Sequence, residues 1–195
     1  ASIIKVIEAL GDVTAVTSAS AHDLSKHGLP EDAVEAITNP DDKKIETDLE
    51  CLSESNRHLL CWGDDAYPSL LKRIGSHPAA LFIEGNPGQL WRPQIAVIGS
   101  RNPTNLGLDH ARDYATTLAA QCITITRGLA SGIDTASHKA ALDAGAPTVA
   151  VNGTGLDRVY PASSRNVASM IRSHGTMVSE MPLGSPPRRK HFPSR

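Results

Sequence analysis

Between residues 94 and 179 the sequence alternates short apolar runs with segments of helical length, and this rhythm constrains the fold more than any other feature. The apolar runs cover residues 94–98, 122–126, 147–151 and 176–179. The segments between them cover residues 106–121, 133–144 and 163–173. Strands that alternate with helices form parallel sheets through right-handed crossovers. The predicted fold class is therefore α/β with a Rossmann-like parallel sheet, in which residues 94–98 are buried on both faces.

The first 55 residues predict a small all-α domain. An apolar stripe at helical spacing stops at Gly11 and consists of Ile3, Ile4, Val6, Ile7 and Leu10. Residues 24–37 predict two short helices around Gly28, and Pro30 opens the second one. Residues 41–55 predict a further amphipathic helix with an acidic polar face. Such a domain serves either as an interaction module or as a simple cap, and the sequence supports the two interpretations equally.

A connecting region joins these two parts. It predicts a strand, one or two helical turns and a second strand, at residues 58–61, 67–74 and 80–84. We therefore expect a helical domain at residues 1–55 and a Rossmann-like domain at residues 56–195. The strand at residues 176–179 would lie at an open sheet edge, and the segment after it is rich in proline and cations. We expect the Rossmann-like domain to be truncated at its C-terminal end.

Charge is divided unevenly along the chain. Residues 1–95 contain 8 Lys and Arg against 15 Asp and Glu, whereas residues 96–195 contain 11 against 6. A basic half suggests contact with an anionic partner, although chance variation between two solvated surfaces would also produce this division. No apolar run is long enough to cross a bilayer, and no signal peptide is evident. We therefore expect a cytoplasmic protein without membrane contact.

The residues that usually carry catalysis or metals form no recognisable set. Cys51, Cys61 and Cys122 are odd in number and fit no metal-binding spacing, and Cys122 is expected as a small core residue. Asp134 and His138 lie one helical turn apart, which is more typical of a capping and packing pair than of an acid–base pair. The sequence lacks the dinucleotide-binding and Walker-type glycine motifs. We expect no catalytic residue, no metal and no cofactor.

Glycine-rich loops follow three of the predicted strands. The carboxyl ends of parallel strands meet at one edge of the sheet, where ligands bind. Glycine lets a backbone N–H approach an anion, helix N-termini add partial positive charge, and arginine supplies a fixed charge. The candidate phosphate-binding residues are Gly99, Ser100, Arg101, Thr104, Gly107, Arg127, Gly128, Gly132, Gly153, Thr154 and Gly155. One such loop is as easily a plain turn, whereas three at one edge favour a phosphate site.

These loops belong to an ordered set of motifs that resembles the DNA-processing protein A (DprA/Smf) family. The matching motifs are Tyr67-Pro-x-Leu-Leu, Leu81-Phe-x-x-Gly-Asn86, Gly99-Ser-Arg101, Gly128-Leu-Ala-x-Gly-Ile-Asp134, His138, Gly153-Thr-Gly-Leu-Asp157, Tyr160-Pro161, Ser179-Glu180 and His191-Phe-Pro193. The match covers about residues 58–195. The helical N-terminus resembles the sterile-alpha-motif-like or helix-hairpin-helix-like domain that many members carry.

The resemblance implies an extended Rossmann fold, a homodimer and single-stranded DNA binding without enzymatic activity. It also implies protection of incoming DNA during natural transformation and loading of the RecA recombinase. By position in the motifs, Arg101 and Arg189 would contact phosphates, and Phe192 would offer a base-stacking face unless it packs as a plug beneath the tail. The other basic candidates at this edge are Arg158, Arg165, Arg188 and Lys190. A cationic groove with an aromatic platform is what sequence-independent binding of single strands requires.

The sequence departs from the family pattern in places. Arg127 stands where members usually have a small residue, and Asn152 stands where an apolar residue is commoner. The main dimerisation and RecA-contact surfaces of the family lie largely beyond residue 195. Two other functions fit a Rossmann-like fold. One is a nucleoside-monophosphate phosphoribohydrolase, although Gly153-Thr-Gly155 matches the glycine motif of those enzymes only in part. The other is a sensor that binds a nucleotide in the same pocket.

Overall fold

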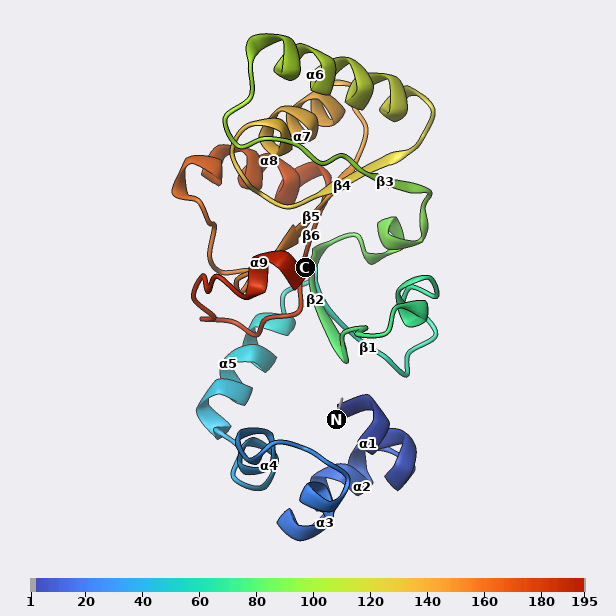
Figure 1. Cartoon of the computed structure of the whole chain (residues 1–195), viewed down its shortest axis with the longest axis vertical. Coiled ribbons are helices and arrows are strands. Elements are labelled where there is room, and N and C mark those ends of the chain that lie inside the picture. The colour runs from blue at the N-terminus through green and yellow to red at the C-terminus, as the bar shows by residue number, and fades with distance from the viewer. Residues whose placement is uncertain (1–2, 195) are drawn as a thin grey trace.

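The computed structural model describes residues 3–194, and it confirms the α/β fold class (Figure 1). Within these residues the strands form one six-stranded sheet in the order β1-β2-β6-β5-β4-β3. The strands are β1 (Arg57–Cys61), β2 (Ala80–Gly85), β3 (Gln94–Ala96), β4 (Thr124–Arg127), β5 (Thr148–Asn152) and β6 (Thr176–Ser179). Strands β3 to β6 run parallel, while β2 pairs antiparallel with both β1 and β6.

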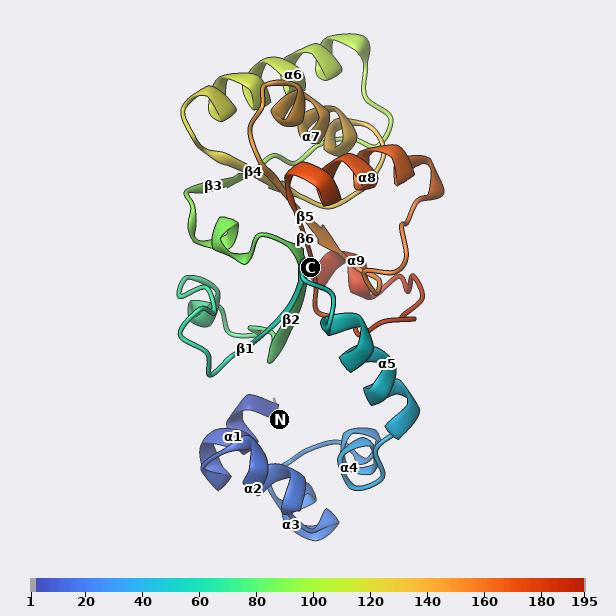
Figure 2. The ribbon, with the colours of Figure 1, turned by 180° about the vertical axis from the view of Figure 1, so that it is seen from behind.

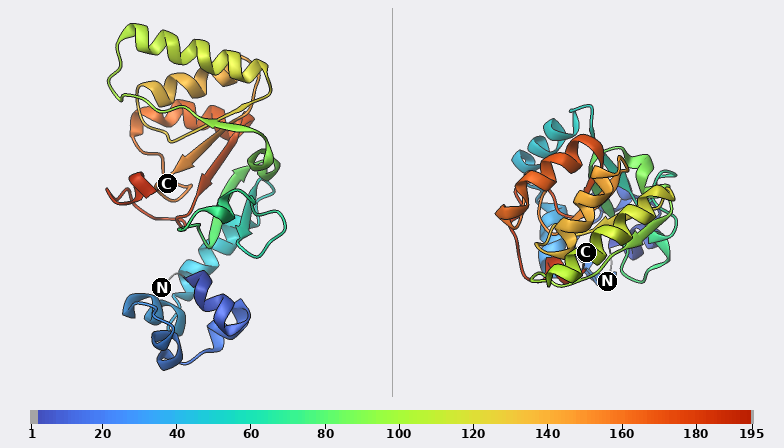
Figure 3. Two further views of the ribbon diagram at one scale, coloured as in Figure 1. Left: turned by 45° about the vertical axis from the view of Figure 1, so that its right-hand side comes forward. Right: turned by 90° about the horizontal axis from the view of Figure 1, so that it is seen from above.

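Three helices form the crossovers and cover one face of the parallel strands (Figures 1 and 3). They are α6 (Asn105–Ala120), α7 (Ile133–Asp143) and α8 (Arg165–His174). Alanines such as Ala115 and Ala141 are fully buried where α6 packs on α7, because small side chains let helices approach closely. The opposite face packs against the connecting region, where Tyr67 and Leu81 contact Val149 and Val178. The region also contains the short turns η1 (Leu71–Arg73) and η2 (Pro87–Trp91).

The N-terminal residues form a helical cluster that lies at the end of the molecule opposite α6 (Figures 1 and 2). Its helices are α1 (Ile3–Leu10), α2 (Val13–Ser18), α3 (Ala21–Lys26) and α4 (Glu31–Thr38). They enclose a core of their own around Val6, Val16 and Leu24. Helix α5 (Asp42–Leu52) leads from this cluster to the sheet and buries none of its residues. No helix in the described part of the chain is long and apolar enough to span a membrane.

The sheet edges differ from expectation. We expected the strand at 176–179 at an open edge, but β2 pairs with it, from Phe82 opposite Ser179 to Gly85 opposite Thr176. The edge strands are β1 and β3, and the prediction that the run at residues 94–98 is buried on both faces is wrong. In β3, Ile95 is 41% exposed, and Ile98 beyond its end is 89% exposed. A strand that pairs on one side only leaves its other side open, which no local sequence pattern reveals.

Cys122 is also not the core residue that we expected. It is exposed and has a φ of 58°, so it belongs to the turn that joins α6 to β4. Strand β4 begins two residues later at Thr124, which is buried. The apolar run was placed two residues too early, because Cys122 and Ile123 complete the turn after the helix.

Candidate nucleic-acid interface

The loops at the carboxyl ends of β3 to β6 meet at one edge of the sheet and are joined by hydrogen bonds. The amide of Ile133 donates to the carbonyl of Ser100 at 3.1 Å, which connects the first loop to the second. The Ser164 hydroxyl donates to the carbonyl of Leu129 at 2.7 Å, and the Ser179 hydroxyl donates to that of Thr154 at 2.7 Å. The four loops therefore form one connected surface, as the strand order requires.

Gly132 brings the first two loops into close contact. Its φ of +79° is a conformation that side chains rarely adopt. A Cβ atom at this position would collide with the carbonyl of Ser100 and would lie 2.7 Å from that of Arg101. The backbone of the Gly-Ser-Arg loop thus lies directly on Gly132, and the Arg101 side chain is exposed.

The first loop leads into helix α6, which is capped by Thr104. The Thr104 hydroxyl accepts from the amide of Gly107 at 3.1 Å, and the Ser100 hydroxyl accepts from the amide of Asn102 at 3.1 Å. Both hydroxyls lie on exposed residues, so they can also reach a ligand. They fix the conformation in which the loop presents Arg101.

Arg127 is buried and does not lie where it could contact a phosphate. Its guanidinium pairs with Asp134 at the first turn of α7, and the two side chains are only 5% and 9% exposed. A carboxylate oxygen of Asp134 also accepts from the amide of Ala130 at 3.4 Å. The pair therefore holds the second loop from inside, and the expected contact between Arg127 and a phosphate does not fit this placement.

The third loop is also built into the protein interior. Gly153, Thr154 and Gly155 are buried, and the Thr154 hydroxyl donates to the carbonyl of Arg158 at 3.0 Å. The amide of Gly155 donates to the carbonyl of Ser185 at 3.2 Å. These groups shape the loop, and they leave the exposed side chains that follow it to meet a ligand.

His138 has a structural environment. It is completely buried, with Nδ1 2.8 Å from the Thr148 hydroxyl and Nε2 2.9 Å from the carbonyl of Gly128. Both ring nitrogens therefore have hydrogen-bond partners inside the protein. This arrangement agrees with a packing role for His138 and leaves no nitrogen directed at a substrate.

The C-terminal segment returns across the same edge. Helix α9 (His191–Ser194) places Phe192 against Gly153, where an added Cβ would lie 3.1 Å from the ring. The centroids of the Phe192 and Tyr160 rings are 5.4 Å apart. His191 Nδ1 lies 3.1 Å from the carbonyl of Gly153. Phe192 is thus half-buried within an aromatic pair.

Exposed cationic side chains lie on the segments that carry this aromatic pair and on the first loop. The exposed basic candidates at the edge are Arg101, Arg158, Arg165, Arg188, Arg189 and Lys190. Arg158 lies 3.5 Å from the carboxylate of Asp157, and both of these side chains are well exposed. A surface contact of this kind is weak in water and leaves Arg158 able to meet a phosphate. The loops at this edge of the sheet and the tail therefore both carry exposed basic residues.

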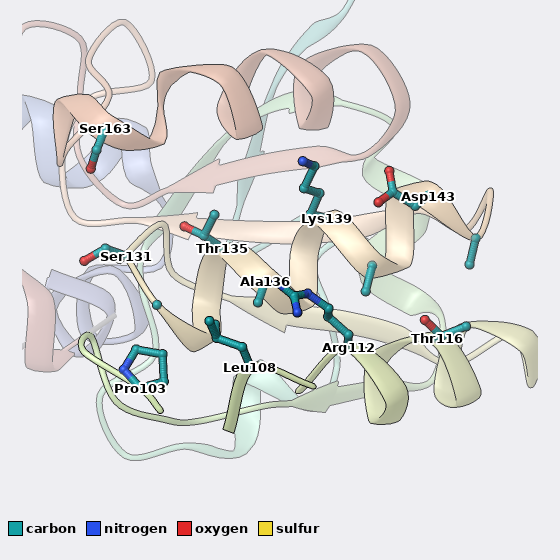
Figure 4. Close-up of a pocket in the computed structure, with 13 residues that line it drawn as sticks. Pro103, Leu108, Arg112, Thr116, Ser131, Thr135, Ala136, Lys139, Asp143 and Ser163 are labelled. Atoms are coloured by element: carbon teal, nitrogen blue, oxygen red, sulfur yellow. The ribbon is translucent and has the colours of Figure 1, made fainter. Parts of the chain in front are cut away.

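A groove adjoins these loops, and α6 and α7 supply most of its lining (Figure 4). Its volume is about 660 Å³. Its lining includes the small residues Ala136 and Ala140 and the cations Arg112 and Lys139. Ser131 lies at the end next to the loops, so the groove continues from the candidate interface. No group of three or more His, Cys, Asp or Glu within residues 3–194 is arranged to hold a metal ion.

Comparison with known proteins identifies the family of the chain. The model of the family described as DNA recombination-mediator protein A matches residues 58–195, which include every loop of the candidate interface. The chain belongs to the DNA recombination-mediator protein A family. The resemblance seen in the sequence motifs is thereby confirmed.

Curated relatives of the recombination-mediator family align with most of this chain. Protein Smf of Escherichia coli is 41% identical over 154 residues, which cover 78% of this chain and 41% of the relative. DNA processing protein DprA of Streptococcus pneumoniae is 40% identical over 132 residues, which cover 68% of this chain and 46% of the relative. The chain therefore spans less than half the length of these two relatives.

Two solved structures of DNA processing protein A have the same fold. The crystal structure of DprA from Streptococcus pneumoniae superposes with a TM-score of 0.83 at 32% identity, covering 98% of this chain and 66% of that one. DprA from Helicobacter pylori superposes with a TM-score of 0.62 at 26% identity, covering 71% and 61%. The latter structure is described as revealing a single-stranded DNA binding mode of that protein.

Proposed function

We propose that this chain binds single-stranded DNA along the edge formed by the Gly-Ser-Arg loop, the segment 158–165 and the basic tail. The observation that carries the proposal is the contact between the rings of Tyr160 and Phe192, whose two chain segments also carry five exposed cationic residues, with Arg101 exposed on the first loop. Cations neutralise phosphates regardless of sequence, and aromatic rings stack on any base. Membership of the recombination-mediator family supports this assignment.

The site residues divide into two roles in this proposal. Arg101, Arg158 and Arg165 contact phosphates from the folded loops, and the tail adds Arg188, Arg189 and Lys190. Arg127, Gly132 and the buried third loop hold these side chains in place and do not touch the strand. The two roles are assigned by burial, because only a side chain that is exposed to solvent can contact a phosphate of the strand.

Arg101→Ala tests the proposal directly. We expect its affinity for a thymidine oligonucleotide to fall, and the slope of log affinity against log salt to decrease by about 0.7, the value for one phosphate contact on a single strand. Anisotropy titrations of wild type and variant over a salt series measure both quantities. Arg73→Ala in η1, between β1 and β2, is the control and should bind as wild type. Equal affinity and slope for Arg101→Ala would exclude the proposal.

We infer wider roles for the full-length protein from the family relationship. These are protection of incoming DNA in natural transformation, loading of RecA and homodimerisation, in the cytoplasm. Because the chain spans 41% of the Escherichia coli relative, these roles need the full-length protein for their test. RecA filaments should form faster on single-stranded DNA when the full-length protein is present than when it is absent. Light scattering of the full-length protein should give the mass of a dimer.

We infer a binding protein and not an enzyme. The phosphoribohydrolase alternative relied on Gly153-Thr-Gly155, but these residues are buried and the Thr154 hydroxyl donates to the backbone. Incubation with AMP should release no adenine, and release of the base would favour the enzyme. The nucleotide-sensor alternative is tested by thermal shift, in which oligonucleotides should stabilise the protein more than mononucleotides do.

A further inference from the structure

Tyr160 is a large aromatic side chain that the fold leaves on the surface. Half of it (50%) is exposed. Its ring packs against Phe192, with the planes inclined by 40°. Tyr160 therefore has one partner ring and an outer face that meets solvent.

The segment that carries Tyr160 is anchored on both sides. On one side the carbonyl of Arg158 accepts from the Thr154 hydroxyl at 3.0 Å. On the other side Ser164, which is 1% exposed, donates to the carbonyl of Leu129 at 2.7 Å. A ring on an anchored segment loses little conformational freedom when a ligand stacks on it. The backbone of Tyr160 is thus held in place before any ligand arrives.

Phe192 is less suited than Tyr160 to receive a base from solvent. It is half-buried, because it lies against the Gly153 backbone as well as against Tyr160. A base that approaches from the surface meets the exposed tyrosine ring, while Phe192 supports that ring from within. Arg158 and Arg165 lie near Tyr160 in the chain and are exposed, so they can hold the phosphates on either side of a stacked base.

We propose that Tyr160 is a base-stacking residue for single-stranded nucleic acid, with Phe192 as its supporting ring and Arg158 and Arg165 as the neighbouring phosphate contacts. This inference rests on the proposed DNA binding and adds to it the residue that contacts a base. It predicts a contribution to affinity that depends on the presence of bases and is independent of salt.

The test compares Tyr160→Ala, Tyr160→Leu and Tyr160→Phe in oligo-dT titrations at fixed salt. Loss of one stacking contact should weaken binding by about 5- to 150-fold for the alanine and leucine variants. The leucine variant retains bulk against Phe192 but has no π-face, so its loss separates stacking from packing. The phenylalanine variant should bind as wild type. Tyr114→Ala on α6, where the ring is 67% exposed, is the matched control and should also bind as wild type.

An abasic oligonucleotide of the same length completes the test. Wild type and Tyr160→Ala should bind it equally, and the salt slope on oligo-dT should be the same for both proteins. Wild-type affinity of Tyr160→Leu for oligo-dT, or an equal loss on the abasic strand, would overturn the stacking role. If Arg101→Ala weakens binding while the Tyr160 variants do not, only the stacking role fails. If wild type does not bind oligo-dT, the proposed function itself fails.

Discussion

At the scale of single residues, the contacts of buried polar side chains fix the loops that carry the exposed side chains. Arg127 and Asp134 pair beneath the second loop, and His138 bridges the Thr148 hydroxyl and the carbonyl of Gly128. A buried polar group without a partner is costly, so each of these contacts fixes one geometry of the loop. The interface therefore depends on residues that a DNA strand never touches.

Tyr67 gives a prediction about stability and pH. Burial, together with the negative charge of Glu180, raises the pKa of Tyr67 from 10.0 to about 12. The folded state holds the hydroxyl proton of Tyr67 more tightly than the unfolded state does. The resulting contribution to the free energy of unfolding is therefore complete below pH 10 and is lost as the pH rises to 12. Urea unfolding at a series of pH values should show that the free energy of unfolding declines over this range in wild type and declines less in Tyr67→Phe. The same dependence on pH in both proteins would contradict the prediction.

At the scale of elements, the contact between the first loop and the start of α7 has no room for a side chain. We expect Gly132→Ala to lower the free energy of unfolding by about 2 to 5 kcal/mol, since it combines a strained φ with a collision against two carbonyls. It should also weaken oligo-dT binding, because the displaced carbonyls belong to the loop that carries Arg101. Urea unfolding and anisotropy titrations measure the two effects.

Gly145→Ala is the matched control for this substitution. Gly145 also has a positive φ, of +70°, but nothing lies within 4 Å of an added Cβ. We expect only the conformational strain of about 1 to 2 kcal/mol and unchanged DNA affinity. Similar losses of stability and affinity in both variants would show that the close approach at Gly132 has no special role.

At the scale of the whole molecule, the helical cluster and the α/β part have separate cores. Leu24 is completely buried in the helical cluster, so Leu24→Ala should lower the free energy of unfolding of this cluster by about 2 to 5 kcal/mol. A loss of this size is enough to unfold a small cluster. Hydrogen exchange should accelerate in α1 to α4 but not in β4 to β6, and oligo-dT affinity should not change. Leu49→Ala on α5, where the side chain is 61% exposed, should alter neither quantity. Faster exchange throughout the sheet would contradict this separation.

Much of the fold could be predicted from the sequence, because hydrophobic periodicity is local. The three crossover helices begin and end within about two residues of expectation, and β6 matches its predicted range. Helix α2 was missed, since Val13–Ser18 is short and β-branched. The order of strands at the sheet edges was missed because a strand's neighbour is set by the whole chain.

The site could be predicted only in part for the same reason. The loops were expected to meet because parallel strands end at one edge, and they do meet. The burial of Arg127 and the contact between Tyr160 and Phe192 depend on side chains that approach only after folding. Tyr160 had one signal in the sequence, an aromatic residue between Arg158 and Arg165 in a chain with 4% aromatics.

The pairing of β2 with β6 also has a consequence for biosynthesis. Phe82 pairs with Ser179, so nearly one hundred residues separate partners in adjacent strands. The β1–β2 hairpin leaves the ribosome before the other strands and must wait, with one side unpaired, until all three crossovers have been made. Contacts of such long sequence separation form slowly, and an unpaired strand is prone to aggregate meanwhile. The closing of this sheet is therefore a late event in folding, and the nascent hairpin is the segment that a chaperone would protect.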